Sequence, residues 1–313
     1  MSSNAQERAD RLATLPFQKS ASAGRANVVE AVRELFQHRE LLGLLVRREL
    51  KSRYKDSSLG FLWSLIRPLT MLLIYYVAIG QFLGAARGIP DFAIFVFAGL
   101  TIWGLYAEIV TGGTLSIVGN AGLIKKVYLP REIFPLAATG SALFNFAIQL
   151  VVLVGATVVL GQFPVSWNLL YLPVAIAIVL VWGVGLGILL SALNVFLRDV
   201  QYLVEVALLI LFWASPIVYS WSYVVNAAVL ADLPWLPAVY LLNPISNAVI
   251  AFQKGIWLAG SEIRMIDGVE IPPQPWPDDL NMRLFIMFVV GVVFLVICQR
   301  VFQRLQGNFA QEI

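Results

Sequence analysis

The sequence predicts an all-α integral membrane protein with six transmembrane helices, and three observations lead to that fold class. Of the 313 residues, 59% are hydrophobic and only 13% are charged, which is more apolar surface than a soluble domain of this length can bury. The apolar residues gather in runs long enough to cross a bilayer. Most basic residues fall between alternate runs, as positive-inside insertion requires.

Six runs meet the requirement of roughly 20 apolar residues per span. Pro68, Pro135 and Pro173 lie in the first turns of their runs, where a missing N–H costs little, so we interpret them as helix starts. The six spans are expected near residues 59 to 83, 92 to 114, 133 to 160, 169 to 195, 201 to 219 and 283 to 304.

The positions of Lys and Arg predict that both termini are cytosolic. Eleven of the 22 basic residues precede Ser58, and seven more fall on the same side: Arg67, Lys125, Lys126, Arg131, Arg198, Arg300 and Arg304. The other side holds Arg87, Lys254, Arg264 and Arg283. This imbalance is the one that membrane insertion requires.

The N-terminal part divides into two regions before the first span. The apolar residues of the segment 1–27 show no regular spacing, so this segment is expected to form a loose cytosolic tail. We expect no cleavable signal peptide. Residues 28–58 are expected to form a surface helix followed by a basic amphipathic interface helix. Anionic lipid attracts each cation of such a helix by about 1 kcal/mol. Its cations are Arg47, Arg48, Lys51, Arg53 and Lys55.

The transmembrane domain is expected over residues 59–313, with a long exterior connection at about 220–282. Pro234, Pro237 and Pro244 interrupt an apolar stretch in that connection, so it cannot form a simple span. We expect a pair of re-entrant helices that face the bundle, because irregular backbone at membrane depth must be covered by protein or water. A folded cap on the outer surface is the alternative. An exposed, acidic, Pro-rich loop follows.

The cytosolic loop between the second and third spans contains a short segment bounded by helix-breaking residues, which predicts a short helix. Asn120 and Gly122 break the preceding helix, and Pro130 ends the element before Arg131 and Glu132. Apolar residues with basic neighbours suit docking into a groove of a partner protein. An ordinary loop that satisfies the positive-inside rule is the alternative. The apolar and basic residues are Leu123, Ile124, Lys125, Lys126 and Tyr128.

Two acidic residues fall inside predicted spans. Glu108 and Glu205 are costly there unless they face protein or water. A structural pair with Arg67, Arg131 or Arg198 and a role in transport are both open.

Signatures of catalysis are missing, so we expect no enzyme. The sequence has no G-x-x-x-x-G-K-[ST] phosphate loop. It has one cysteine, Cys298, and one histidine, His38, which excludes a thiolate or histidine metal site. The acidic pair Asp278 and Asp279 lies in the exterior loop. A membrane-embedded transferase would need a cytosolic acidic metal site, and none is present.

Five co-linear motifs resemble one transporter family. They are RRELKSRYKDSSLGFLWSLIRPL, NAGLIKKVYLPREIFPLA, LNVFLRDVQYLVEVALLILFWASPIVYS, LLNPISNAVIAFQ and FQRLQGNFAQEI, and together they cover roughly residues 40 to 313. The match is to permeases of ABC-2-type transporters. Within that family the sequence resembles exporters of polysaccharides and polyol phosphates, meaning O-antigen, teichoic-acid and cell-wall galactan exporters.

The resemblance implies a homodimeric permease in the cytoplasmic membrane of a bacterium. Two separate ATPase subunits would hold ATP and Mg, so no cofactor is expected in this chain, and no nucleic-acid partner. The substrate would be a glycan linked to a polyprenyl diphosphate. An ABC-2 permease for a drug or small lipid is the alternative. A longer N-terminus and an enlarged exterior loop depart from the family pattern and leave the exact glycan open.

The resemblance also assigns roles to parts of the chain. The coupling helix that fits the ATPase would lie in LIKKVYLPRE, and the segment containing Asn243 and Pro244 would form the re-entrant helices. We further expect the cations of the interface helix to hold the diphosphate, since guanidinium groups match phosphate oxygens, with lipid-headgroup anchoring as the alternative. Aromatic faces at membrane depth would line the channel and stack on sugars, or simply pack. These aromatics are Tyr75, Tyr76 and Phe212.

Overall fold

The computed structural model describes residues 39–54, 62–82, 84, 89–126, 129–261, 263–266, 269–271 and 273–312. The predicted tail over residues 1–27, the surface helix expected from residue 28, and the predicted site residues Lys55 and Tyr128 lie outside the described residues.

Four long apolar helices confirm the second, third, fourth and sixth predicted spans. Each is long and apolar enough to cross a membrane. Leucine, isoleucine, valine and phenylalanine are abundant in them, and their charged residues are few. They are α5 (Phe92–Gly119), α7 (Ile133–Val159), α8 (Tyr171–Phe196) and α13 (Leu280–Leu305).

The helices at the first and fifth predicted spans are shorter. The first consists of α4 (Trp63–Tyr75), which continues as the π-helix η2 (Tyr76–Phe82). The fifth, α9 (Val200–Trp213), ends before the predicted limit at residue 219. Pro216 explains this early end, because a residue that precedes proline is driven out of the helical region and proline has no N–H to donate.

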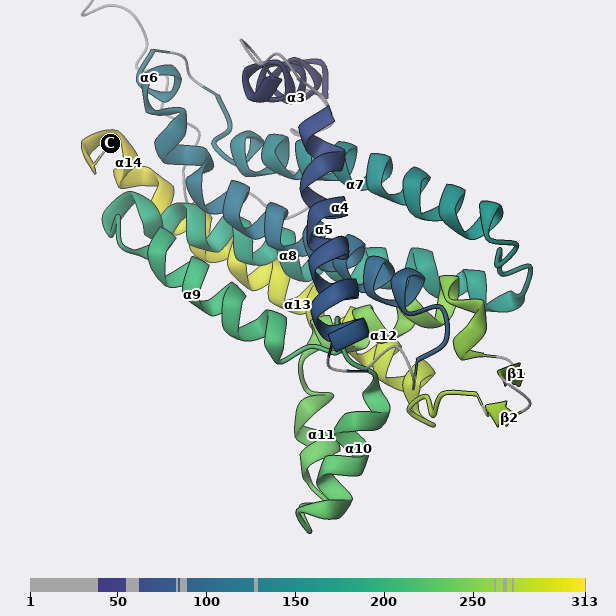
Figure 1. Cartoon of the computed structure of the whole chain (residues 1–313). Helices are drawn as coiled ribbons and strands as arrows, with labels where there is room; N and C mark the ends of the chain where they lie inside the picture. Colours follow the sequence, from purple (N-terminus) through teal and green to yellow (C-terminus); the bar gives the residue numbers. More distant parts are fainter. Residues whose placement is uncertain are drawn as a thin grey trace, which may run out of the picture.

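The predicted pair of re-entrant helices is not confirmed. Helices α10 (Trp221–Leu230) and α11 (Leu236–Tyr240) project away from one end of the bundle (Figure 1). Helix α12 (Pro244–Ile256) instead packs among the long helices, and nearly all of its residues are buried. Asn243 begins α12 by accepting a hydrogen bond from the Ile245 N–H at 3.0 Å, with Pro244 at the first helical position.

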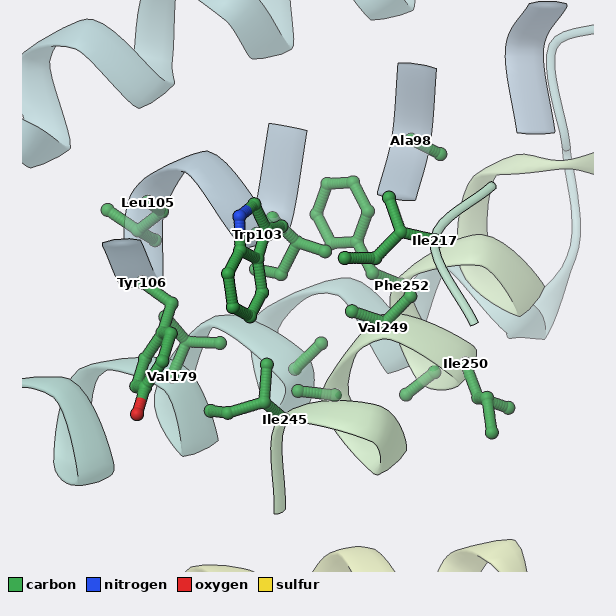
Figure 2. Close-up of a cluster of buried hydrophobic side chains, with 14 of the residues drawn as sticks. Ala98, Trp103, Leu105, Tyr106, Val179, Ile217, Ile245, Val249, Ile250 and Phe252 are labelled. Atoms are coloured by element: carbon green, nitrogen blue, oxygen red, sulfur yellow. The ribbon is translucent and has the colours of Figure 1, made fainter. Parts of the chain in front are cut away.

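The main core lies where α5, α8 and α12 meet. Figure 2 shows Trp103 and Tyr106 of α5 beside Ile245, Val249 and Phe252 of α12. Trp103 and Tyr106 also contact each other, with ring centroids 5.7 Å apart. The core therefore joins the long helices to the exterior connection.

The acidic segment that follows α12 contains a β-hairpin. Strands β1 (Arg264–Ile266) and β2 (Val269–Ile271) pair antiparallel, with Arg264 opposite Ile271. Apart from this hairpin, the regular structure of the described residues is helical. The remaining short elements are η4 (Trp167–Leu170), η5 (Leu258–Gly260), α3 (Arg39–Tyr54), α6 (Ala121–Ile124), η6 (Gln306–Asn308) and α14 (Phe309–Glu312).

Candidate functional site

Three short elements gather at the end of the bundle opposite α10 and α11. They are α3, α6 and the C-terminal α14 (Figure 1). A second apolar core lies beneath them, separate from the core around α12. It holds Leu45 of α3, Ile117 of α5, Ile133 of α7, Phe302 of α13 and Phe309 of α14. The residues Leu123 and Ile124 of α6 also pack against this core. Helices α3 and α6, two predicted functional segments far apart in the sequence, therefore share one small core.

Helix α3 lies against α7 and has two distinct faces. Its Leu45 is buried, and its Val46 packs against Gly140 of α7. A Cβ atom on Gly140 would lie only 2.7 Å from Val46 Cγ2, so the glycine permits this close packing. The opposite face is exposed and includes three of the five predicted cations, Arg47, Arg48 and Lys51. The side chain of Arg53 lies outside the described residues.

The predicted short helix in the loop between the second and third spans is present as α6. Asn120 separates it from α5 with non-helical backbone angles, φ −110° and ψ 16°. Leu123 and Ile124 are half-buried against the second core, whereas Lys125 and Lys126 are exposed. The two lysines therefore lie on the surface, while the two apolar side chains stabilise the fold.

Arg131 and Glu132, which we expected to belong to the docking segment, face the C-terminal part of the chain. The Arg131 guanidinium carbon lies 5.4 Å from the centroid of the Phe309 ring. Glu132 is 8% exposed, and its Oε1 accepts a hydrogen bond from Gln299 Nε2 at 3.1 Å. A cation over an aromatic face and a hydrogen-bonded buried carboxylate are structural contacts. Sequence reasoning missed this role, because Phe309 and Gln299 are more than 160 residues away from their partners.

Two of the three predicted channel residues come together. The rings of Tyr75 on α4 and Phe212 on α9 are stacked, with centroids 5.9 Å apart and planes inclined by 27°. Phe212 also lies edge-on to Trp103 of α5, 5.7 Å between centroids. Tyr76 is on the exposed side. Within one copy of the chain, Tyr75 and Phe212 therefore pack against each other.

The two acidic residues in the predicted spans have different surroundings. Asn145 of α7 donates a hydrogen bond from Nδ2 to Oε1 of Glu108 at 2.7 Å, which joins α5 to α7. Glu205 lies on the exposed face of α9 among apolar side chains. Glu108 thus has a structural contact with Asn145, which is not one of the three arginines proposed as its partners from the sequence.

No metal-binding group of three or more His, Cys, Asp or Glu side chains occurs among the described residues. The free thiol of Cys298 is buried. At the opposite end of the bundle, Arg283 Nε donates to Asp279 Oδ1 at 2.7 Å, and this contact lowers the pKa of the Asp279 carboxyl from its ordinary value. That pair is exposed and screened by solvent, so we assign it no large effect on stability.

A bundle of long apolar helices, with a basic surface helix at one end, defines a helical membrane protein that crosses the bilayer several times. The sequence model of the family described as ABC-2 type transporter matches residues 40–257. The chain therefore belongs to the ABC-2 type transporter family, as its motifs indicated.

Several relatives are similar over most of the chain. An O-antigen export system permease protein, RfbA of Myxococcus xanthus, is 30% identical over 91% of this chain and 100% of its own length. An RfbA of Klebsiella pneumoniae is 26% identical over 87% of this chain and 94% of its own length. The polysialic acid transport protein KpsM of Escherichia coli is 23% identical over 66% of this chain and 80% of its own length.

Proposed function

We propose that this chain is the membrane-spanning subunit of an ATP-driven exporter that moves a polyprenyl-diphosphate-linked polysaccharide out across the cytoplasmic membrane. The observation that carries the proposal is the similarity to an O-antigen export permease over that relative's whole length. Because the similarity covers 91% of this chain, it supports a shared function for the membrane-spanning part as a whole. ATP hydrolysis would take place in a separate partner subunit.

The end of the bundle formed by α3, α6 and α14 is our proposed cytosolic face. It carries the exposed cations of α3 and α6, which agrees with positive-inside insertion. The exposed Lys125 and Lys126 would meet an acidic rim of the ATPase. Leu123 and Ile124 would hold α6 in place from below. Arg131 and Glu132 would support this face through α13 and α14 instead of touching the partner.

We propose that α4 with η2, and α9 with the turn that follows it, complete a six-span arrangement in a homodimer. Helix α9 has 14 residues, or about 21 Å at 1.5 Å per residue, which is shorter than a hydrocarbon layer of about 30 Å. The non-helical residues after it would have to complete the crossing, covered by protein. The large side chains that α9 exposes would face lipid or the second copy: Tyr202, Leu203, Val206, Leu209, Ile210 and Trp213.

The substrate would enter beside the basic face of α3 and leave along α4 and α9. Guanidinium groups of Arg47 and Arg48 suit diphosphate oxygens. The stacked rings of Tyr75 and Phe212 would need to separate, or to turn toward the partner copy, before either could stack on a sugar. Stacking of this kind holds a polymer weakly enough to let it slide.

The test is reconstitution of the chain with its ATPase subunit in membranes that contain lipid-linked glycan. ATP turnover should rise when the glycan is added, and the Lys125→Glu, Lys126→Glu double variant should lose this stimulation and bind less ATPase. The matched Lys125→Arg, Lys126→Arg variant keeps the charge and should behave like the parent. Stimulation by drugs or short lipids, with none by glycan, would instead support a small-amphiphile permease.

A further inference from the structure

One side chain ties the basic helix α3 to the junction between α5 and α6. The Nη2 of Arg48, on the exposed face of α3, donates a hydrogen bond to Oδ1 of Asn120, 72 residues further along the chain. The same Asn120 donates from Nδ2 to the Ser116 carbonyl at 2.7 Å. A single amide therefore holds both the last turn of α5 and the end of the Arg48 side chain.

Asn120 is also the residue on which α6 is built. Its carbonyl accepts hydrogen bonds from the backbone N–H groups of Leu123 at 2.9 Å and Ile124 at 3.1 Å. These bonds form the first turn of α6. Asn120 links α6 to α5 through the chain and through hydrogen bonds, so a displacement of α6 also moves Asn120.

Two further contacts of α3 are apolar. Leu45 enters the second core, and Val46 rests on Gly140 of α7. The hydrophobic attraction behind these contacts has no preferred direction. A hydrogen bond from a guanidinium is directional and is strengthened by the charge of its donor. Arg48 therefore adds a directional connection between α3 and the α5–α6 junction to these apolar contacts.

We propose that Arg48 is a coupling residue: through Asn120 it makes α3 follow the movement of α6. This inference rests on the proposed function, in which an ATPase subunit acts on α6. ATP binding would displace α6, the Asn120 side chain would carry that displacement to Arg48, and the cations of α3 would shift beside the entering diphosphate. Arg48 acts here through another residue, so it is a positioning residue for transport.

The experiment follows α3 directly by hydrogen–deuterium exchange of the complex with its ATPase in lipid nanodiscs. Exchange is compared without nucleotide and after trapping with ATP and vanadate, in the parent, Arg48→Ala and Arg39→Ala chains. Arg39 is a matched control, because it is an exposed arginine at the start of the same helix. No glycan is needed, so this measurement is independent of the identity of the substrate.

In the parent and in Arg39→Ala, we expect peptides from α3 and from residues 119–126 to change exchange together on trapping. In Arg48→Ala, residues 119–126 should still respond, while the response of α3 should fall at least several-fold. An α3 response in Arg48→Ala equal to that of the parent would overturn the inference, as would an α3 that never responds. A parent in which residues 119–126 do not respond would contradict the ATPase-docking part of the proposed function instead.

Substitutions of Asn120 supply a second measurement. Asn120→Asp keeps an acceptor for Arg48, whose guanidinium a carboxylate attracts more strongly than an amide does, but it loses the donation to the Ser116 carbonyl. This variant therefore separates the link to Arg48 from the bond to Ser116. Asn120→Ala removes the acceptor. We expect glycan export per ATP hydrolysed to stay near the parent value in Asn120→Asp and to fall several-fold in Asn120→Ala and in Arg48→Ala. The double Arg48→Ala, Asn120→Ala variant should be no worse than the poorer single variant; additive losses would show that the two residues act separately.

Discussion

At the scale of single residues, the absence of a side chain sets how closely α5 and α8 approach. A Cβ atom on Gly113 of α5 would lie 2.7 Å from Gly187 Cα and 3.1 Å from its carbonyl carbon. Both of these atoms are backbone, so no rotamer change could relieve the overlap. Small residues at such crossings let helices in membranes pack through van der Waals contact, where no hydrophobic force between helices is available.

Gly113→Ala should therefore destabilise the protein by about 1–3 kcal/mol, the usual cost of overpacking. The measurement is the Tm of the detergent-solubilised protein. Gly155→Ala is the matched control, because Gly155 lies within α7 and nothing is found within 4 Å of its Cβ position. That control should be neutral or slightly stabilising, since alanine favours helix more than glycine does. Equal Tm values for the two variants would contradict the proposed close contact.

Gln253 is a second residue whose side chain affects another segment, because its buried amide lies close to three backbone carbonyls. Its Nε2 lies 3.0 Å from the Pro216 carbonyl, 3.5 Å from that of Ile217 and 3.5 Å from that of Phe95. The residues after α9 have left the helix, so their carbonyls need other donors. Gln253 of α12 provides one.

Gln253→Leu should remove this donor and leave buried carbonyls unsatisfied, at a cost of about 1–3 kcal/mol. We expect a lower Tm and faster proteolysis between α9 and α10. The matched control is Asn226→Leu, an amide-to-leucine change on the exposed side of α10, which should leave both measurements near the parent values. Unchanged proteolysis in Gln253→Leu would show that other contacts hold the turn.

At the scale of elements, the long connection between α9 and α13 consists of two parts with different surroundings. Helix α12 is embedded, and its polar residues serve the chain around it: Asn247 Nδ2 donates to the Leu241 carbonyl at 2.7 Å and to the Asn243 carbonyl at 2.9 Å. Helices α10 and α11 project from the bundle and expose Val229, Leu230 and Trp235 at and near the turn between them (Figure 1). The connection that prolines interrupt thus forms one buried helix, α12, and one projecting pair, α10 and α11.

The elements at the basic end of the bundle show a similar division. The sequence predicts one docking segment over residues 120 to 132, but its charged residues have two different surroundings in the structure. Lys125 and Lys126 are exposed, whereas Arg131 and Glu132 are engaged with Phe309 and Gln299. Mutations at the second pair would therefore disturb α14 and the second core before they affected a partner.

At the scale of the whole molecule, the two ends of the bundle differ in the chemistry they present. One end holds the basic helix α3, α6 and the C-terminal helix; the other holds α10, α11 and the β-hairpin (Figure 1). If the first end is cytosolic, the membrane orientation follows from charge alone. The orientation can be tested without any substrate.

Single cysteines at Asp278 and Lys126, both exposed positions, should react from opposite sides of the membrane. An impermeant thiol reagent added outside cells should label Asp278→Cys at once and Lys126→Cys only after permeabilisation. Cys298 is buried, and a Cys298→Ala background is the control for labelling of the native thiol. The reverse pattern would invert the orientation and move the proposed ATPase face outside.

The sequence by itself determined the membrane class, the four long helices, the basic surface helix and the short helix after Asn120, because hydropathy, charge and helix-breaking residues act locally along the chain. Tertiary structure alone decided which side chains meet. Phe309 beneath Arg131, Gln253 on the Pro216 carbonyl and Arg48 on Asn120 join residues that are far apart in the sequence. It also decided that α12 enters the bundle while α10 and α11 leave it. Such contacts depend on how helices pack in three dimensions, and no local pattern of residues encodes that packing.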